Sequence, residues 1–193
     1  AISGYSWCCF PAMLERTWGW APEPFPVAFG LMTLILAPIS VLFAGWLNDR
    51  WFAAGREDAA MRIMIIAASI EIPMAILTPL MPTPGFALAV LSVAIIGNAM
   101  TTAAAPAGLV HITPSKYRGL IIALYYMVIS LTGLVLGPGC VGWLSDNIFG
   151  NDHLNYAVAA TSAIFGIPVL LLLPYGLHRF RDELVRRRAQ QSA

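Results

Sequence analysis

The chain has 193 residues, of which 59% are hydrophobic and 11% are charged, and its formal net charge is +1. This balance excludes an ordinary soluble domain, in which charged residues make up about a quarter of the chain. The composition is that of an all-α integral membrane protein, for which we expect a lipid environment and no nucleic-acid partner.

Five complete membrane-spanning helices are predicted, because about 20 apolar residues are needed to cross about 30 Å of hydrocarbon. Segments without Asp, Glu, Lys or Arg cover 24–48, 72–115, 119–145 and 153–178. The second segment is long enough for two crossings, and the proline- and glycine-rich turn at 78–85 divides it. The expected helices lie near 26–47, 61–80, 86–112, 119–144 and 155–176.

Residues 1–14 are apolar but too short to cross a bilayer, and we expect them to be the end of a truncated sixth helix. The chain begins with Ala1 rather than Met, and its first basic residue is Arg16. The basic flank of a secretory signal peptide is therefore missing. No metal or cofactor is expected, because the three cysteines (Cys8, Cys9, Cys140) lack metal-ligand and disulfide spacing.

Glu71 is the only acidic residue deep inside an expected helix. It follows Arg62 by nine residues, or about 13 Å along a helix axis, which places it near the middle of the membrane. An ionised carboxylate costs several kcal/mol there, so Glu71 should be protonated, paired or turned toward water. Two interpretations remain open: a group that takes up and releases a proton, or a structural group hydrogen-bonded to Ser69 or to nearby backbone.

A narrow polar stripe lies on the expected helix 86–112. Asn98, Thr101, Thr102 and Ala105 follow the spacing i, i+3, i+4, i+7, and Pro106 frees the carbonyl of Thr102. This face should not contact lipid. The stripe therefore predicts either the wall of an aqueous cavity or hydrogen bonds between helices.

The expected helix 119–144 combines a hydroxyl group with small residues on one face. Tyr126, Ser130, Gly133 and Gly137 are spaced i, i+4, i+7, i+11, and the glycines favour close packing against another helix. Tyr126 lies too far inside the helix for an interfacial aromatic belt, so its hydroxyl is a candidate for a cavity.

The positive charges predict the orientation of the chain. If the helices alternate in direction, ten of the eleven Lys and Arg residues lie on one side and Arg16 alone lies on the other. The rich side should be cytoplasmic, and it includes the C-terminal tail 177–193. This basic tail is predicted to lie on anionic headgroups as an amphipathic helix, or alternatively to bind a regulatory partner.

One five-residue pattern, Gly-Trp-Leu-x-Asp, occurs twice, at 45–49 and at 142–146. The first copy leads into Arg50 on the basic side, and the second leads into Asn147 on the opposite side. With the truncated segment counted as helix one, the copies end helices two and five. This placement fits two three-helix repeats that are inverted relative to each other in the membrane.

These motifs resemble the C-terminal half of the major facilitator superfamily, in its spinster-like and organic-anion branch. Gly45, Asp49 and Arg50 match the signature after the second helix, but the following Gly55-Arg56 pair comes later than in the family pattern. Arg118-Gly119 is similar to the start of the fifth helix, and the segment 133–139 is similar to a glycine-proline motif.

The resemblance implies a six-helix half of a twelve-helix secondary transporter with alternating access to a central cavity. It assigns a cytoplasmic gate to Gly45, Asp49, Arg50 and Arg118, for which a plain positive-inside flank is the alternative. It suggests the cavity candidates Tyr5, Trp7, Asn98, Thr101, Thr102 and Tyr126. Glu71 is the candidate for proton coupling, although the third helix of each triplet is peripheral in the family.

The implied partners are a small organic solute, carboxylated or amphipathic, together with protons, membrane lipids and the missing N-terminal half. The sequence has no phosphate-binding glycine-lysine loop of the kind that binds ATP. An enzyme is not expected, because His111, His153 and His178 lie far apart and no catalytic cluster is evident. A non-transporting membrane scaffold or receptor subunit remains the alternative function.

Overall fold

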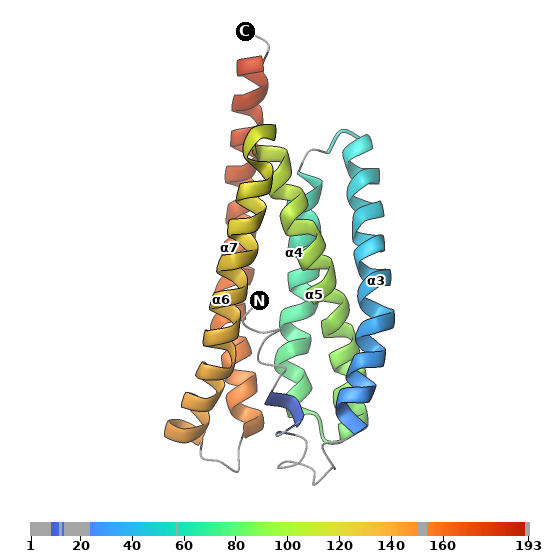
Figure 1. Cartoon of the computed structure of the whole chain (residues 1–193), viewed down its shortest axis with the longest axis vertical. Helices are drawn as coiled ribbons and strands as arrows, with labels where there is room; N and C mark the ends of the chain where they lie inside the picture. Colours follow the sequence, from blue (N-terminus) through green and yellow to red (C-terminus); the bar gives the residue numbers. More distant parts are fainter. Residues whose placement is uncertain (1–8, 12, 14–23, 57, 150–153, 192–193) are drawn as a thin grey trace.

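The computed structural model describes residues 9–11, 13, 24–56, 58–149 and 154–191, and all regular structure in them is helical. Five helices are long and apolar enough to cross a membrane (Figure 1). They are α3 (Pro24–Ala53), α4 (Ala59–Leu77), α5 (Pro84–Ile112), α6 (Arg118–Leu144) and α7 (Leu154–Gln191). The short helices η2 (Thr78–Leu80), η3 (Ser115–Tyr117) and η4 (Ser145–Phe149) adjoin them.

The turn between α4 and α5 lies where the prolines predict it. η2 ends at Leu80, and Thr83 then takes an extended conformation as the N-cap of α5. Pro84 occupies the first turn of α5, where the amide hydrogen that it lacks is not needed. At the other end of the bundle, Gly55 turns the chain between α3 and α4 with a φ of 80°, a conformation that favours glycine.

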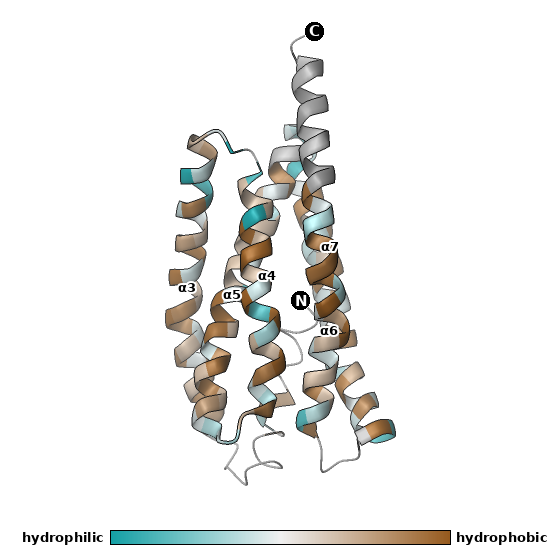
Figure 2. Cartoon of the chain, turned by 180° about the vertical axis from the view of Figure 1, so that it is seen from behind, coloured by the Kyte–Doolittle hydropathy of each residue, from teal (hydrophilic) through white to brown (hydrophobic). Residues whose placement is uncertain are grey.

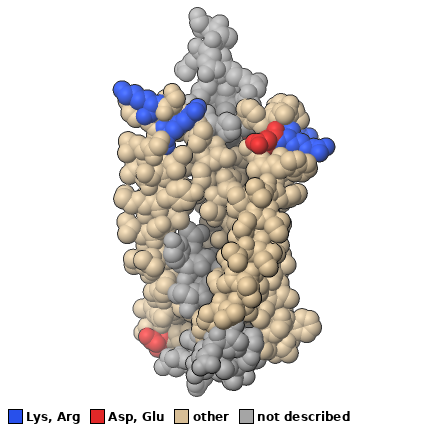
Figure 3. Space-filling model, turned by 45° about the vertical axis from the view of Figure 1, so that its right-hand side comes forward, with Lys and Arg blue, Asp and Glu red and all other residues tan. Residues whose placement is uncertain are grey.

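Successive long helices run in opposite directions, so the connections alternate between the two ends of the bundle (Figure 1). Arg50, Arg56, Arg62, Lys116 and Arg118 belong to helix ends and connections at one end, and the Lys and Arg residues visible in Figure 3 gather there. We call this the basic end. The charge asymmetry expected from the sequence is therefore present in the described part of the chain.

The helix boundaries differ from the expected ones mainly at the basic end. α3 continues past residue 47 to Ala53 and includes Asp49 and Arg50. α7 was expected to stop at 176, but it continues through Pro174 as one helix to Gln191 (Figure 1). The tail is rich in Arg, Leu, Glu, Ala and Gln, which are strong helix formers, so the helix continues beyond Pro174 and Gly176.

α4 occupies the centre of the bundle, where it packs against both α5 and α7. Two glycines permit this close packing. A Cβ atom added at Gly97 of α5 would lie 2.8 Å from the backbone nitrogen of Glu71, and one added at Gly166 of α7 would lie 2.5 Å from Cγ2 of Ile72. Both contacts fall at the same level of α4, so this helix is held from two sides there.

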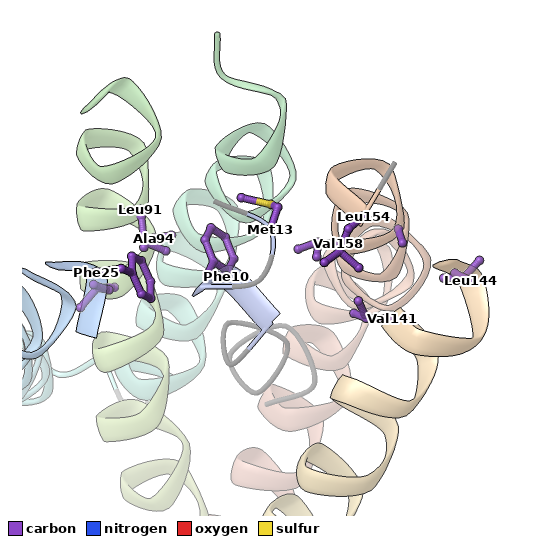
Figure 4. Packing of buried hydrophobic residues seen from close by; sticks show 11 residues of the cluster. Phe10, Met13, Phe25, Leu91, Ala94, Val141, Leu144, Leu154 and Val158 are labelled. Carbon is purple, nitrogen blue, oxygen red and sulfur yellow. The ribbon is translucent and has the colours of Figure 1, made fainter. Parts of the chain in front are cut away.

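The largest apolar cluster lies toward the end opposite the basic end. Phe10 and Met13 point into the space between α5 and α7, beside Leu91 and Val158 (Figure 4). A second cluster of smaller residues joins α3, α4 and α5, and it contains Ala44, Ile63, Ala67, Met100 and Ala104. Of the expected segment 1–14, only residues 9–11 and 13 are among those described.

α3 and α6 are the least buried of the five long helices. Within their most hydrophobic windows only 11% and 6% of the residues are buried, against 33–44% in the other three. Their exposed residues are large and apolar, including Leu42 and Leu134, and Figure 2 shows hydrophobic residues along both helices. These surfaces are suited to lipid or to further transmembrane helices rather than to water.

Candidate functional site

A buried polar cluster joins α4 to α5 in the middle of the membrane-spanning region. Glu71 is only 6% exposed. Nδ2 of Asn98 donates a hydrogen bond to Oε1 of Glu71 at 3.0 Å, and Oγ1 of Thr101 lies 3.4 Å from Oε2. Both carboxyl oxygens therefore have a partner on the neighbouring helix. We call these three residues the Glu71 cluster.

Local sequence explains how the cluster assembles. Asn98 and Thr101 lie three residues apart and share one face of α5. Gly97, which has no side chain, lets that face approach the backbone of α4 at Ala67 and Glu71. Oγ1 of Thr101 also lies 3.0 Å from the carbonyl oxygen of Gly97, which ties the cluster to the same turn of α5.

The polar stripe predicted on 86–112 divides between two environments. Asn98 and Thr101 are half-buried against α4, and Ala105 is buried. Thr102 is exposed, and its hydroxyl donates to the carbonyl oxygen of Asn98 at 2.9 Å. Hydrogen bonding between helices thus occupies two polar side chains of the stripe, while the third stays at the surface of this bundle.

Ser69, an expected alternative partner of Glu71, is exposed and donates to the carbonyl oxygen of Ile65 instead. The roles of Gly97 and Asp58 were not expected from the sequence. Oδ2 of Asp58 accepts from Nε of Arg62 at 3.0 Å in an i, i+4 ion pair, whose spacing was visible in the sequence. No pattern within α5 marked Gly97 as the contact point.

The four gate candidates lie near the basic end and have local contacts. The guanidinium group of Arg50 stacks over the ring of Trp46 at 5.3 Å, one turn earlier in α3. Nε of Arg118 donates to the carbonyl oxygen of Thr113 at 3.2 Å. Asp49 is exposed, and a Cβ atom added at Gly45 would meet nothing within 4 Å.

The other cavity candidates divide between described and undescribed residues. Tyr126 is 43% exposed on α6, and its ring meets that of Tyr125 edge-on with 5.4 Å between centroids. Tyr5 and Trp7 lie outside the described residues. On the expected packing face of α6, Gly133 and Gly137 are buried, whereas Tyr126 and Ser130 are exposed.

The two Gly-Trp-Leu-x-Asp copies have matching environments at opposite ends of the bundle. The glycine, tryptophan and aspartate are exposed in both copies, and the leucine is turned further inward. The fourth position also matches: Oδ1 of Asn48 and Oγ of Ser145 are both buried and have no hydrogen-bond partner within the described part of the chain. The two copies therefore share a pattern of exposure, although 45–49 lie within α3 and the second copy passes from α6 into the π-helix η4 at Ser145.

Among the described residues, no group of three or more His, Cys, Asp or Glu side chains is placed to hold a metal ion. Comparison with protein families gives a match to the family model of the Major Facilitator Superfamily over residues 2–190. No match is found among curated proteins or among solved structures.

Proposed function

Because the chain belongs to the major facilitator superfamily, we propose that this multi-pass membrane transporter moves a small organic solute by alternating access. The driving force is an ion gradient or the gradient of the solute itself. In this proposal the chain supplies the six-helix C-terminal half of the transporter, and a missing N-terminal half completes the cavity. A carboxylated or amphipathic solute fits the spinster-like and organic-anion branch that the motifs resemble.

The single observation that carries this proposal is the environment of the two Gly-Trp-Leu-x-Asp copies. Each copy lies at the end of one of the two most exposed helices, and the two copies lie at opposite ends of the bundle. Inverted repeats of this kind let one set of contacts exist in two arrangements related by a pseudo-two-fold axis in the membrane plane, which is the basis of alternating access in many transporters. A scaffold has no need for such an arrangement.

We place the basic end on the cytoplasmic side of a cell membrane, because Lys and Arg are in excess there. Gly45, Asp49, Arg50 and Arg118 then form the cytoplasmic gate. Arg50 is held over Trp46 at the end of α3, where it can meet an acidic group or the carbonyl end of another helix in a second conformation.

The cavity wall is assigned by the exposure of each polar side chain. Thr102 and Tyr126 are exposed, and we assign their side chains to direct contact with the solute in the cavity. Asn98 and Thr101 belong to the same wall, but their polar atoms are engaged with Glu71, so they act on the solute through the position of α5. Tyr5 and Trp7, which lie outside the described residues, complete the proposed set.

Solute uptake by the full-length protein in proteoliposomes tests the proposal directly. If an ion gradient drives transport, we expect accumulation that disappears when an ionophore collapses that gradient. If the solute's own gradient drives it, we expect equilibration of the solute that the ionophore does not change. Protein-free liposomes and ATP-loaded liposomes without a gradient are the controls. A correctly folded protein that moves none of a panel of organic anions and amphipathic solutes would favour the scaffold or receptor alternative.

Glu71→Gln is expected to abolish the dependence of uptake on a pH gradient while leaving solute exchange without a gradient in place. Glutamine keeps the size and hydrogen-bonding capacity of the side chain but cannot release a proton. Uptake is measured with and without an inward proton gradient. Ser69→Ala is the control, because Ser69 lies on the same helix and bonds only the carbonyl oxygen of Ile65. Unchanged gradient dependence in Glu71→Gln would contradict the coupling role.

A further inference from the structure

Two arginines at the basic end lie over tryptophan rings where α3 ends. Cζ of Arg50 is 5.3 Å from the ring centroid of Trp46, and Cζ of Arg56 is 5.9 Å from that of Trp51. Both arginines are exposed. Within the described part of the chain neither forms an ion pair with a carboxylate, although Asp49 precedes Arg50. The rings therefore hold two positive charges in place without neutralising them.

The turn after α3 places Arg56 beside Trp51. Gly55 has a φ of 80°, and its N–H donates to the carbonyl oxygen of Phe52 at 2.9 Å. The N–H of Arg56 donates to the carbonyl oxygen of Trp51 at 3.0 Å. These two bonds form a glycine-terminated helix end, in which the residue after the glycine folds back over the last turn. An apolar side chain often makes that contact, but here a guanidinium group makes it with an aromatic ring.

The exposed face of α3 has an aromatic pair directly before Arg50. The rings of Phe43 and Trp46 stack with 5.9 Å between centroids, and the two residues are 51% and 53% exposed. Arg50 follows Trp46 by one turn, or about 6 Å along the helix axis. Exposed aromatic rings followed by a basic side chain are typical of a bilayer surface. Close helix packing instead favours small residues, so this stretch of α3 is suited to lipid.

We propose that Trp46, Arg50, Trp51 and Arg56 form a binding site for the headgroup of an anionic phospholipid. A guanidinium group has its five N–H donors in one plane, so stacking on a ring leaves them free for phosphate oxygens. Such charge-assisted hydrogen bonds are strong. The rings and the glycine turn orient both arginines before the lipid binds, which lowers the cost of ordering them. The acyl chains then lie along the exposed apolar surface of α3.

This site does not rest on the proposed transport function. Arg50 is also a proposed gate residue, so lipid retention is measured without solute and without a gradient. A protein that retains the lipid but moves no solute would contradict the proposed function alone. A working transporter that retains no anionic lipid would contradict this site alone.

Native mass spectrometry of the full-length protein with added lipid tests the proposal. We expect the wild-type protein to retain phosphatidylglycerol at concentrations at which phosphatidylcholine is lost. Arg50→Gln and Arg56→Gln should each weaken retention of phosphatidylglycerol about fivefold, the contribution of one arginine at an anionic surface. Excess inorganic phosphate should leave the lipid in place, because it lacks the acyl chains.

Trp46→Leu separates a built site from a merely positive surface, because it removes the ring and keeps the charge of Arg50. Retention of phosphatidylglycerol should fall about two- to fivefold, the contribution of an exposed cation–π pair. Trp143→Leu is the matched control. Trp143 occupies the same position in the second Gly-Trp-Leu-x-Asp copy and is 61% exposed, but Asn147 follows that copy where Arg50 follows the first. Its loss should leave retention unchanged.

Arg118→Gln provides a second control at the basic end, since Nε of Arg118 already donates to the carbonyl oxygen of Thr113. Equal retention of the two lipids by the wild-type protein, or displacement of the lipid by inorganic phosphate, would overturn the proposal. So would an Arg118→Gln loss as large as that of Arg56→Gln, or wild-type retention in Trp46→Leu. Trp46 and Arg56 are exposed, so these variants should remain folded, which their unfolding temperatures check.

Discussion

Replacing Gly97 with alanine is expected to destabilise the protein by about 1–3 kcal/mol, the usual cost of adding a carbon to a well-packed interior. The new Cβ would lie 2.8 Å from the Glu71 nitrogen and 2.9 Å from the Ala67 carbonyl oxygen. Both are backbone atoms, so no side-chain rotation can relieve the overlap. α4 and α5 must move apart, which also lengthens the hydrogen bond from Asn98 to Glu71.

Gly108→Ala is the matched control for this experiment. Gly108 lies eleven residues, or three helical turns, after Gly97 on the same face of α5, and an added Cβ would meet Cβ of Ala60 at an ordinary 3.5 Å. Because alanine favours a helix over glycine by about 1 kcal/mol, this variant should be neutral or slightly more stable. Unfolding measured in a denaturing detergent compares the two. Equal stability of both variants would show that the close approach at Gly97 is absent.

Replacing Asp49 with asparagine is expected to reduce the initial transport rate by about 10- to 100-fold. Asp49 is exposed at the basic end and, in the proposed gate, accepts hydrogen bonds from another element in one conformation. A hydrogen bond to a charged group contributes about 1.5–3 kcal/mol, and 1.4 kcal/mol corresponds to a tenfold change in an equilibrium. Loss of this bond would depopulate the state in which the cytoplasmic side is closed.

Asp146→Asn provides the matched control, because Asp146 occupies the same position in the second Gly-Trp-Leu-x-Asp copy and is also exposed. It lies at the opposite end and is followed by Asn147 rather than by an arginine, so its loss should change the rate much less. Initial uptake rates are measured at matched amounts of protein in proteoliposomes. A wild-type rate in Asp49→Asn would remove this residue from the gate.

The first prediction concerns the packing of two helices, and the second concerns the exchange between conformations. Gly97 acts on the packing of α5 against α4, so its variant should lose stability and activity together. Asp49 lies on the surface of the same bundle, so its variant should keep the fold and lose only the exchange between states. A stability measurement on both variants therefore separates a packing defect from a gating defect.

Several parts of the Glu71 cluster could be predicted from the sequence. The distance from Arg62 placed Glu71 near the middle of the membrane, and helical spacing placed Asn98 and Thr101 on one face. Their meeting could not be predicted, because Glu71 and Asn98 lie 27 residues apart on separate helices. Ser69 was the side chain expected to bond Glu71, because only residues on the same helix have a spacing that can be read directly from the sequence.

The basic tail shows a second feature that could not be predicted fully from the sequence. Its charge and its helix-forming residues were evident, but its direction was not. The sequence suggested a separate helix lying on the headgroups, whereas α7 continues without interruption to Gln191. Helix propensity acts on each turn locally and does not register where the hydrocarbon ends, so a segment without a strong helix breaker extends the helix that precedes it.

The sequence by itself determined that the chain has five helices able to span a membrane, which end carries the positive charge, and where the repeated motif falls. Those features depend on hydrophobic length, on prolines and on charge, all of which are local. Only the tertiary structure decided which faces meet. In soluble helices a polar face marks the side that meets water, but here apolar residues predominate around most of each membrane-spanning segment. Close contact then depends on small residues such as Gly97 and on the few polar groups that must find partners.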